Sequence, residues 1–335
     1  MSPSIQRFAI SWPLALLAAA LLLFAPLSVA RASAVITVTT PLPGIANDGQ
    51  CSLIEAIVNA NDDALTHDDC VAGFGADVIE LGAGTIYTLT SVHNTVGGEN
   101  GLPSITSNIT INGHGATIAR SEAGSTPSFR VFHVAATGVL TLNEVTIRNG
   151  AADSDGTGNG GGALFNAGTL TLNNCTVTEN STGTRGGGIA NLGGNVTIGA
   201  SVISLNSAVA AGAGISNRDG FLTVQNSTIS ANTSTTTADE GAGGGIASHA
   251  YNADATLILT DSIVSANTTN GLGGGGIDNS ARTGHTATAT VTRSTISDNV
   301  ANGVDHTNGL GGGIQNSFIR PVSNATARLT VNNST

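Results

Sequence analysis

The segment Gly186-Gly187-Gly188-Ile189-Ala190-Asn191 places three glycines before an apolar residue and ends on a polar residue. The chain repeats this arrangement with small substitutions, and its six copies begin at Gly160, Gly186, Gly212, Gly243, Gly274 and Gly311. Repeats of this kind are typical of solenoid proteins, in which each repeat is one structural unit that buries its apolar side against the next. We therefore predict a repeat architecture over 160–316.

A second polar column gives the length of one repeat. Its members are Asn180, Asn206, Asn232, Asn267 and Asn299, at intervals of 26, 26, 35 and 32 residues. We interpret each interval as one coil of the chain. Stacked asparagine side chains can hydrogen-bond from one coil to the next, so we expect these five residues to form a ladder.

Each coil also contains strand-like segments. Around Leu170, Val196 and Leu222, apolar residues alternate with polar ones, which is the two-residue period of a half-buried strand. A small column and an apolar column follow, and we expect both to face inward. The small column is Cys175, Ser201, Ser227, Ser262 and Ser294, and the apolar column is Val177, Ile203, Ile229, Val264 and Ile296. With the segment after each glycine triplet, we expect three short strands per coil.

A coil of 26 residues cannot bury its own apolar face, so its strands must stack on those of the next coil. The sequence therefore predicts an all-β, right-handed parallel β-helix with coils of about 26–37 residues.

The N-terminus has the features of an export signal. Arg7 precedes an apolar run from Leu14 to Leu27, and Ala32-Ser33-Ala34 supplies small residues for cleavage. The apolar run between Pro13 and Pro26 is shorter than the roughly 20 residues that a membrane span needs. We expect a signal peptide over 1–34, an N-terminal cap over 35–75 and the β-helix over 76–335, with no membrane insertion of the mature chain.

Charge excludes two classes of partner. The formal net charge is −11, it would become −13 without Arg7 and Arg31, and the chain contains no lysine. Nucleic acid and anionic lipid bind to positive surfaces, so neither is an expected partner.

The cap has its own local signals. Val35 to Thr40 has the pattern of a first strand, and Cys51 to Asn61 has that of a short helix in which Ser52 and Glu55 have capping-box spacing. The helix is expected to cover the open end of the β-helix core. In an exported chain, Cys51 and Cys70 are close enough in sequence to form a disulfide that ties the cap.

The segment Cys51-Ser52-Leu53-Ile54-Glu55-Ala56-Ile57 resembles the Cys-Ser-Leu-Arg-Glu-Ala signature of a family of exported bacterial right-handed β-helix proteins, with Ile54 in place of arginine. The resemblance covers roughly Val35 to Ile79. It implies a surface protein whose activity is mostly unassigned in the family. The glycine repeats are similar to those of the polymorphic outer membrane protein family, which implies a surface passenger domain or adhesin.

The C-terminus interrupts the pattern. Ser334 falls in the small column and Thr335 follows it, so the sequence stops before the apolar residue and asparagine that complete earlier coils. We therefore expect a β-helix truncated in the middle of a coil, as the proximal piece of a longer protein.

Several residues carry groups capable of chemistry. His114 in Gly113-His114-Gly115 resembles an element of polygalacturonase-type hydrolases, but the paired acids that glycoside hydrolysis requires are missing, so we interpret it as a turn residue. Asp153 and Asp155 alternate with small residues and form a weak calcium candidate; no other cofactor is expected. Cys175 stands in a serine column, which favours a packing role.

Two larger sets of residues, one of arginines and one of threonines, recur across the coils. Four arginines, which a lyase would need beside calcium-binding acids, are scattered over coils and columns and are interpreted as solvated charges: Arg148, Arg185, Arg218 and Arg293. Four outward-facing threonines form a ladder that suits ice or crystalline polysaccharide but also an ordinary exposed strand: Thr171, Thr197, Thr223 and Thr290.

Insertions between strands are the expected recognition surface, because loops on a rigid scaffold carry function. They fall at two corners, over 233–240 and 303–308 at one and over 250–254, 281–285 and 318–324 at the other. We predict an exported cell-surface scaffold, either an adhesin or a stalk, with extracellular polysaccharide or a host or cell-surface molecule as partner. The alternative is a polysaccharide lyase or glycoside hydrolase, and the sequence leaves catalysis open.

Overall fold

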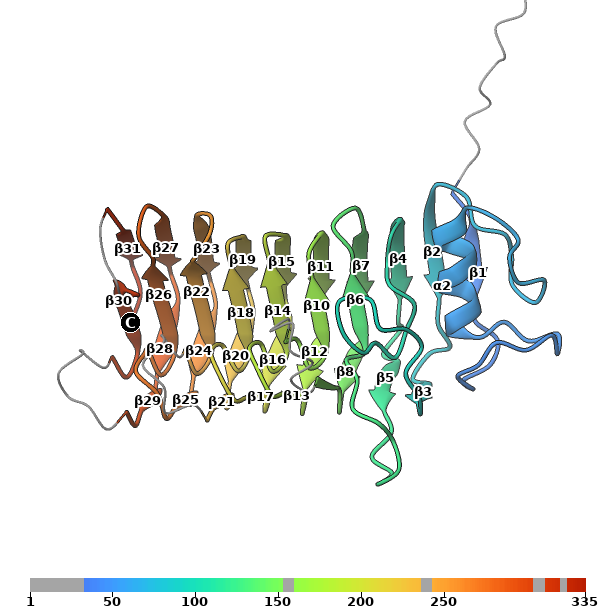
Figure 1. Cartoon of the computed structure of the whole chain (residues 1–335), viewed down its shortest axis with the longest axis horizontal. Coiled ribbons are helices and arrows are strands. Elements are labelled where there is room, and N and C mark those ends of the chain that lie inside the picture. The colour runs from blue at the N-terminus through green and yellow to red at the C-terminus, as the bar shows by residue number, and fades with distance from the viewer. Residues whose placement is uncertain (1–32, 153–159, 236–242, 304–310, 320–323) are drawn as a thin grey trace, which may run out of the picture. The chain divides into compact units, whose positions relative to one another are not determined.

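The computed structural model describes residues 33–152, 160–235, 243–303, 311–319 and 324–335. Ser33–Thr335 forms one compact unit, and its strands are arranged in four parallel sheets. Successive strands of each sheet follow one another from the blue N-terminal cap to the red last coils (Figure 1). This stacking is that of a right-handed parallel β-helix, and it confirms the predicted fold class. The expected signal peptide lies almost wholly outside the described residues.

Sheet 1 has ten strands and receives one strand from every coil, beginning in the cap. Its strands are β1 (Val35–Thr37), β2 (Ala76–Glu80), β4 (Asn108–Asn112), β7 (Val139–Asn143), β11 (Thr169–Asn173), β15 (Asn195–Gly199), β19 (Phe221–Gln225), β23 (Ala255–Thr260), β27 (Thr286–Thr292) and β31 (Thr326–Asn332). In β11, β15 and β19 burial alternates as the sequence predicts, because every second side chain points into the core.

Sheet 2 follows sheet 1 along each coil and contains the apolar column of Val177 and Ile203. Its strands are β3 (Ile86–Leu89), β5 (Thr117–Arg120), β8 (Thr146–Arg148), β12 (Thr176–Thr178), β16 (Val202–Ser204), β20 (Thr228–Ser230), β24 (Ile263–Ser265) and β28 (Thr295–Ser297).

The sequence pattern did not predict sheet 3. Coils that contain it have four strands, so the expectation of three strands per coil was wrong. Its strands are β9 (Ala151–Ala152), β13 (Ser181–Thr182), β17 (Ser207–Ala208), β21 (Thr233–Ser234), β25 (Thr268–Thr269) and β29 (Val300–Ala301). Each strand has two residues, which is too short for alternation to be visible in sequence. The backbone stays extended there because each strand hydrogen-bonds to the same segment of its neighbours, as Ser181 does with Gly150.

From β10 onward, each strand of sheet 4 follows a glycine triplet or its Gly-Ala-Gly equivalent. Its strands are β6 (Phe132–Val134), β10 (Leu164–Asn166), β14 (Ile189–Leu192), β18 (Ile215–Arg218), β22 (Ile246–Ala250), β26 (Ile277–Ala281) and β30 (Ile314–Phe318). Added Cβ atoms at the triplets would lie far inside van der Waals contact; at Gly187, for example, one would lie 2.4 Å from the Ser207 carbonyl oxygen. The triplets therefore let adjacent coils approach closely.

Coil length varies more widely than expected. Equivalent asparagines are 26 residues apart at Asn180 and Asn206, whereas the last coil separates Ser294 from Ser334 by 40 residues. The rungs stay in register despite this. Thr286 still pairs with Thr326 through the whole of β27 and β31.

The cap consists of β1 and one helix, α2 (Leu53–Asp62). The capping box is confirmed: the Ser52 hydroxyl accepts a hydrogen bond from the Glu55 backbone, and the Glu55 side chain accepts one from the Ser52 backbone. The first strand is shorter than expected, because the backbone N–H groups of Thr39 and Thr40 leave sheet 1 to donate to the Cys51 carbonyl. Ile57 and Ala60 of α2 are fully buried in the core.

Candidate functional site

The predicted asparagine column lies at the corner between sheets 2 and 3. Each asparagine donates through Nδ2 to Oδ1 of the next, at 3.0 Å from Asn180 to Asn206 and 2.9 Å from Asn267 to Asn299. The same Oδ1 atoms accept the backbone N–H of the preceding asparagine. The first four side chains are buried and Asn299 is half-buried, and all five are hydrogen-bonded within the stack, so we interpret the column as stabilising the coils.

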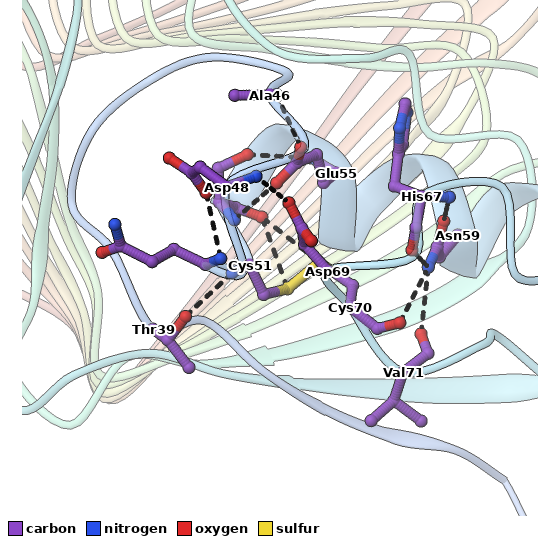
Figure 2. The surroundings of a disulfide bond; sticks show 12 residues. Thr39, Ala46, Asp48, Cys51, Glu55, Asn59, His67, Asp69, Cys70 and Val71 are labelled. Atoms are coloured by element: carbon purple, nitrogen blue, oxygen red, sulfur yellow. Dashed lines mark hydrogen bonds between the residues drawn. A yellow bond between two sulfur atoms is a disulfide. The ribbon is translucent and has the colours of Figure 1, made fainter.

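Cys51 and Cys70 form a disulfide in the cap, which Figure 2 shows beside the helix. The Asn59 side chain ties the returning loop to the helix by donating to the carbonyls of His67 and Val71. A hollow of about 240 Å³ lies in this loop region, and its lining includes Asp68. This hollow is smaller than the ~300–1,000 Å³ of ordinary ligand pockets, so we interpret the cap as a structural element.

Cys175 is buried, and burial raises the pKa of its thiol. A nucleophilic cysteine needs a lowered pKa and access to solvent, so this residue is suited to packing only.

His114 occupies the turn between β4 and β5 with a φ of 51°. Its Nε2 lies 2.7 Å from Oε2 of Glu80, and Asn112 donates to the other Glu80 oxygen at 2.8 Å. Burial alone would raise the pKa of Glu80, but these hydrogen bonds outweigh it and lower that pKa. A lowered pKa keeps the carboxylate ionised, which is the opposite of what a general acid requires.

The predicted threonines lie in one column on the outer face of sheet 1, where Thr171 pairs with Thr197 and Thr197 with Thr223. Ile258 interrupts the column before Thr290. The calcium candidates Asp153 and Asp155 lie outside the described residues. Within the described ranges, no three His, Cys, Asp or Glu side chains gather as a metal site.

The outer face of sheet 4 brings together aromatic, charged and hydroxyl side chains that the sequence pattern did not place side by side. Its inner side faces the core, whereas the outer positions differ from coil to coil. From β6 to β30 the central outer column is His133, Phe165, Ala190, Ser216, Ala247, Asp278 and Gln315.

Tyr251 is the centre of a cationic cluster at this face. Guanidinium carbons lie close to its ring centroid, at 4.1 Å for Arg282, 4.4 Å for Arg218 and 5.5 Å for Arg185. All three distances are within the range of cation–π attraction. Arg218 ends β18, Tyr251 follows β22 and Arg282 follows β26, so the ring lies between arginines of the preceding and following coils. We call these four residues the Tyr251 cluster.

A buried hydrogen bond between His249 and Asp278 lies beside the cluster. Nε2 of His249 lies 2.7 Å from Oδ2 of Asp278, and the two side chains are 2% and 0% exposed. Ser280 donates to the other Asp278 oxygen at 2.9 Å and lies 2.9 Å from the Ser317 hydroxyl. Asp278 stands between the histidine and the serine, so this is not the order of a nucleophilic triad, in which histidine contacts the serine.

Asp219 fixes the position of Tyr251. Its Oδ1 accepts the backbone N–H groups of Tyr251 at 2.6 Å and Asn252 at 2.9 Å. The loop that carries the aromatic ring is therefore held to the preceding coil by charge-assisted hydrogen bonds.

The arginines are not scattered as the sequence suggested. Arg185 and Arg218 meet at Tyr251, although 33 residues separate them, because one coil returns the chain to the same face. Arg148 and Arg293 do remain elsewhere: Arg148 lies 3.9 Å from Glu179, and Arg293 makes two hydrogen bonds to Asp261.

The predicted recognition loops include part of the cluster, since Tyr251 lies in 250–254 and Arg282 in 281–285. Most of the loop over 233–240, nearly all of 303–308 and part of 318–324 lie outside the described residues. A useful sequence signal existed: the chain has two tyrosines, and one of them stands in a loop one coil before an arginine at the equivalent place.

Comparison with protein-family models, with curated proteins and with solved structures gives no match. In the described part of the chain, no helix is long and apolar enough to cross a membrane.

Proposed function

We propose that this chain is an exported cell-surface β-helix that serves as an adhesin-like scaffold and binds extracellular polysaccharide. The Tyr251 cluster carries the proposal. Aromatic and arginine side chains are the groups that most often dominate binding surfaces, and here four of them are gathered from consecutive coils of a rigid stack. Three of the chain's 11 basic residues and one of its two tyrosines lie in this one cluster.

Export is supported by two features of the chain. The N-terminal 34 residues have the composition of a signal peptide, and the cap contains a disulfide, which is typical of proteins outside the reducing cytosol. The resemblance of Cys51–Ile57 to an exported β-helix family agrees with both.

A polysaccharide lyase is the second candidate, because His249, Tyr251 and the arginines include groups that could remove a proton and stabilise the resulting charge. Binding is the better-supported function. His249 and Asp278 are almost completely buried and hydrogen-bonded to each other, so they orient neighbouring groups and have little access to a substrate.

A binding and turnover screen tests the proposal. The purified full chain would be presented to immobilised neutral and acidic polysaccharides, with retention measured alongside the ultraviolet absorbance of unsaturated products and the release of reducing ends. Retention without product supports the adhesin-like function. Product formation that is lost in Tyr251→Phe favours the lyase, and a folded chain that neither binds nor cleaves any polysaccharide contradicts both.

A further inference from the structure

We infer that the outer face of sheet 1, from β4 to β19, binds the surface of ice. This activity goes beyond the proposed polysaccharide binding and uses a different part of the molecule. The face centres on a column of threonines, one from each of five successive strands: Thr110, Thr141, Thr171, Thr197 and Thr223.

The threonine column is regular in position and in side-chain shape. Its five strands pair in register and follow one another in a single row (Figure 1). Neighbouring strands are about 4.8 Å apart, so the hydroxyls recur at that interval along the stack. A β-branched side chain is stiff at χ1, so each threonine presents its hydroxyl and methyl group with little rotational freedom. Rows of oxygen atoms at the surface of ice recur at a similar interval, so the column can match them from one strand to the next.

The hydroxyls of this column are available to water. Each of the five threonines is half-buried, between two buried neighbours that point into the core. In the described part of the chain their hydroxyls make no hydrogen bond. Ser201 and Ser227 of the small column differ, because their hydroxyls donate to backbone carbonyls. Each threonine hydroxyl can therefore donate to one ordered water molecule and accept from another.

An asparagine column beside the threonines makes this part of the face rigid. Asn143 donates to Oδ1 of Asn112 at 2.8 Å, and Asn173 donates to Oδ1 of Asn143 at 2.9 Å. These hydrogen bonds run from coil to coil and fix the side chains that take part. Little conformational freedom therefore remains to be lost when the face meets a solid surface.

The face carries no charge, which suits contact with ice. The chain contains 11 basic and 22 acidic residues, yet none of them stands in β4, β7, β11, β15 or β19. Charge returns only outside this range, at Glu80 in β2 and Arg328 in β31, for example. An ionised side chain is costly to strip of its own hydration shell, so it would oppose contact with a lattice of water molecules.

Other flat partners match this face less well. Threonine is under-represented among the residues that dominate protein–protein binding. A sugar ring packs its C–H groups against aromatic side chains, and Phe221 is the single aromatic residue of these five strands. Ile258 in β23 ends the unbroken run of threonines, so the regular surface is the part that precedes it.

The test measures the coarsening of ice grains in a frozen sucrose solution that contains the purified full chain. We expect coarsening to be slower than with serum albumin at the same concentration. Thr171→Lys places an ammonium group in the middle of the column, so the concentration needed for equal inhibition should rise at least about tenfold. The matched control is Thr176→Lys on sheet 2 of the same coil, where Val202 of the next coil interrupts the threonines. This control should change the required concentration by less than about twofold.

A second variant separates loss of ice binding from a local folding defect. Thr197→Lys repeats the change one coil later and should give the same loss, with circular dichroism melts that match those of the control. Coarsening equal to that with albumin, or equal losses in Thr171→Lys and Thr176→Lys, would overturn the inference. Retention on microcrystalline cellulose that Thr171→Lys abolishes, without any effect on ice, would assign the face to crystalline polysaccharide and would overturn it as well. The function proposed for the Tyr251 cluster is tested separately, by the polysaccharide screen.

Discussion

The two faces of sheet 4 follow different rules. On the inner face, the column from β10 to β30 contains asparagine in five of six coils: Asn166, Asn191, Asn217, Ser248, Asn279 and Asn316. On the outer face, the paired residues in the same strands change from aromatic to small to charged. Each inner side chain must hydrogen-bond or pack with the equivalent side chains of the coils before and after it. An outer side chain need only fit the segment that lies over it. The repeat therefore reflects how the coils stack, and the departures from it reflect what packs over the outer face of sheet 4, where these side chains are largely buried.

The largest effect is expected on the inner face, at Asn191. Its Nδ2 donates to Asn217 Oδ1 and the Gly194 carbonyl, both at 2.8 Å, and its Oδ1 accepts from Asn166 at 2.7 Å. Asn191→Ala leaves these buried partners without their hydrogen bonds, so we expect a loss of about 3 kcal/mol or more in the free energy of unfolding. Urea unfolding followed by circular dichroism measures it.

The matched control is the adjacent outer-face variant Ala190→Ser. Ser216 already occupies the equivalent outer position one coil later, and Ala190 is 6% exposed, so adding a hydroxyl there should cost no more than about 1 kcal/mol, well below the loss at Asn191. Similar losses in the two variants would remove the distinction between the faces.

Arg130 is the outer-face residue that should behave like an inner one. Residues 93–101, which we call the strap, cover Arg130. The Nη1 atom of Arg130 donates to the Gly97 carbonyl at 2.7 Å and to Asn100 Oδ1 at 3.4 Å. Arg130→Met keeps the apolar stem but deprives these acceptors of a donor, so we expect a loss of about 2 kcal/mol.

The control for Arg130 is Arg120→Met. Arg120 also donates to loop carbonyls, at Thr126 and Pro127, but it is more exposed, so water can replace its hydrogen bonds. We expect this variant to lose less than about 1 kcal/mol in a parallel urea titration. A larger loss in Arg120→Met than in Arg130→Met would show that the strap does not exclude water from this part of the outer face.

His133 gives the same region a pH dependence. Burial, and secondarily the Arg130 charge, lower the pKa of its imidazole from 6.5 to about 4. Between those two values the unfolded chain takes up a proton that the folded chain does not, so folding stability is lost as the pH falls from 6.5 to about 4. His133→Phe keeps the stack on Phe165 and removes the titration. Thermal melting at pH 7 and pH 4.5 should show a smaller acid shift in the variant; an identical shift would mean that other groups account for it.

Sequence predicts those parts of the molecule that repeat. The glycine triplets, the asparagine column and the alternation around Leu170 each recur in several coils, so stacking could be inferred from their spacing alone. Sheet 3 was missed because two-residue strands leave no periodic pattern. The Tyr251 cluster was missed for a related reason: Arg218, Tyr251 and Arg282 each occur once, in three different coils, and insertions of different lengths hide that they share one corner.

The smallest effect on stability is expected at Arg218, an outer-face residue to which we assign a binding role. Its side chain is about a third exposed, and its described contacts are the Tyr251 ring and a 3.7 Å approach to Asp219. Arg218→Gln should therefore cost at most about 1 kcal/mol, the value of one partly exposed cation–π contact. The same variant should lower retention on the immobilised polysaccharides of the binding screen, so stability and binding would separate at this residue. Asn191→Ala should do the reverse, with a lowered unfolding midpoint but unchanged affinity at a temperature where the variant is folded. If Arg218→Gln were as destabilising as Asn191→Ala, the cluster would be a fastening of the coils, and the outer face of sheet 4 would belong to the same structural system as the inner one.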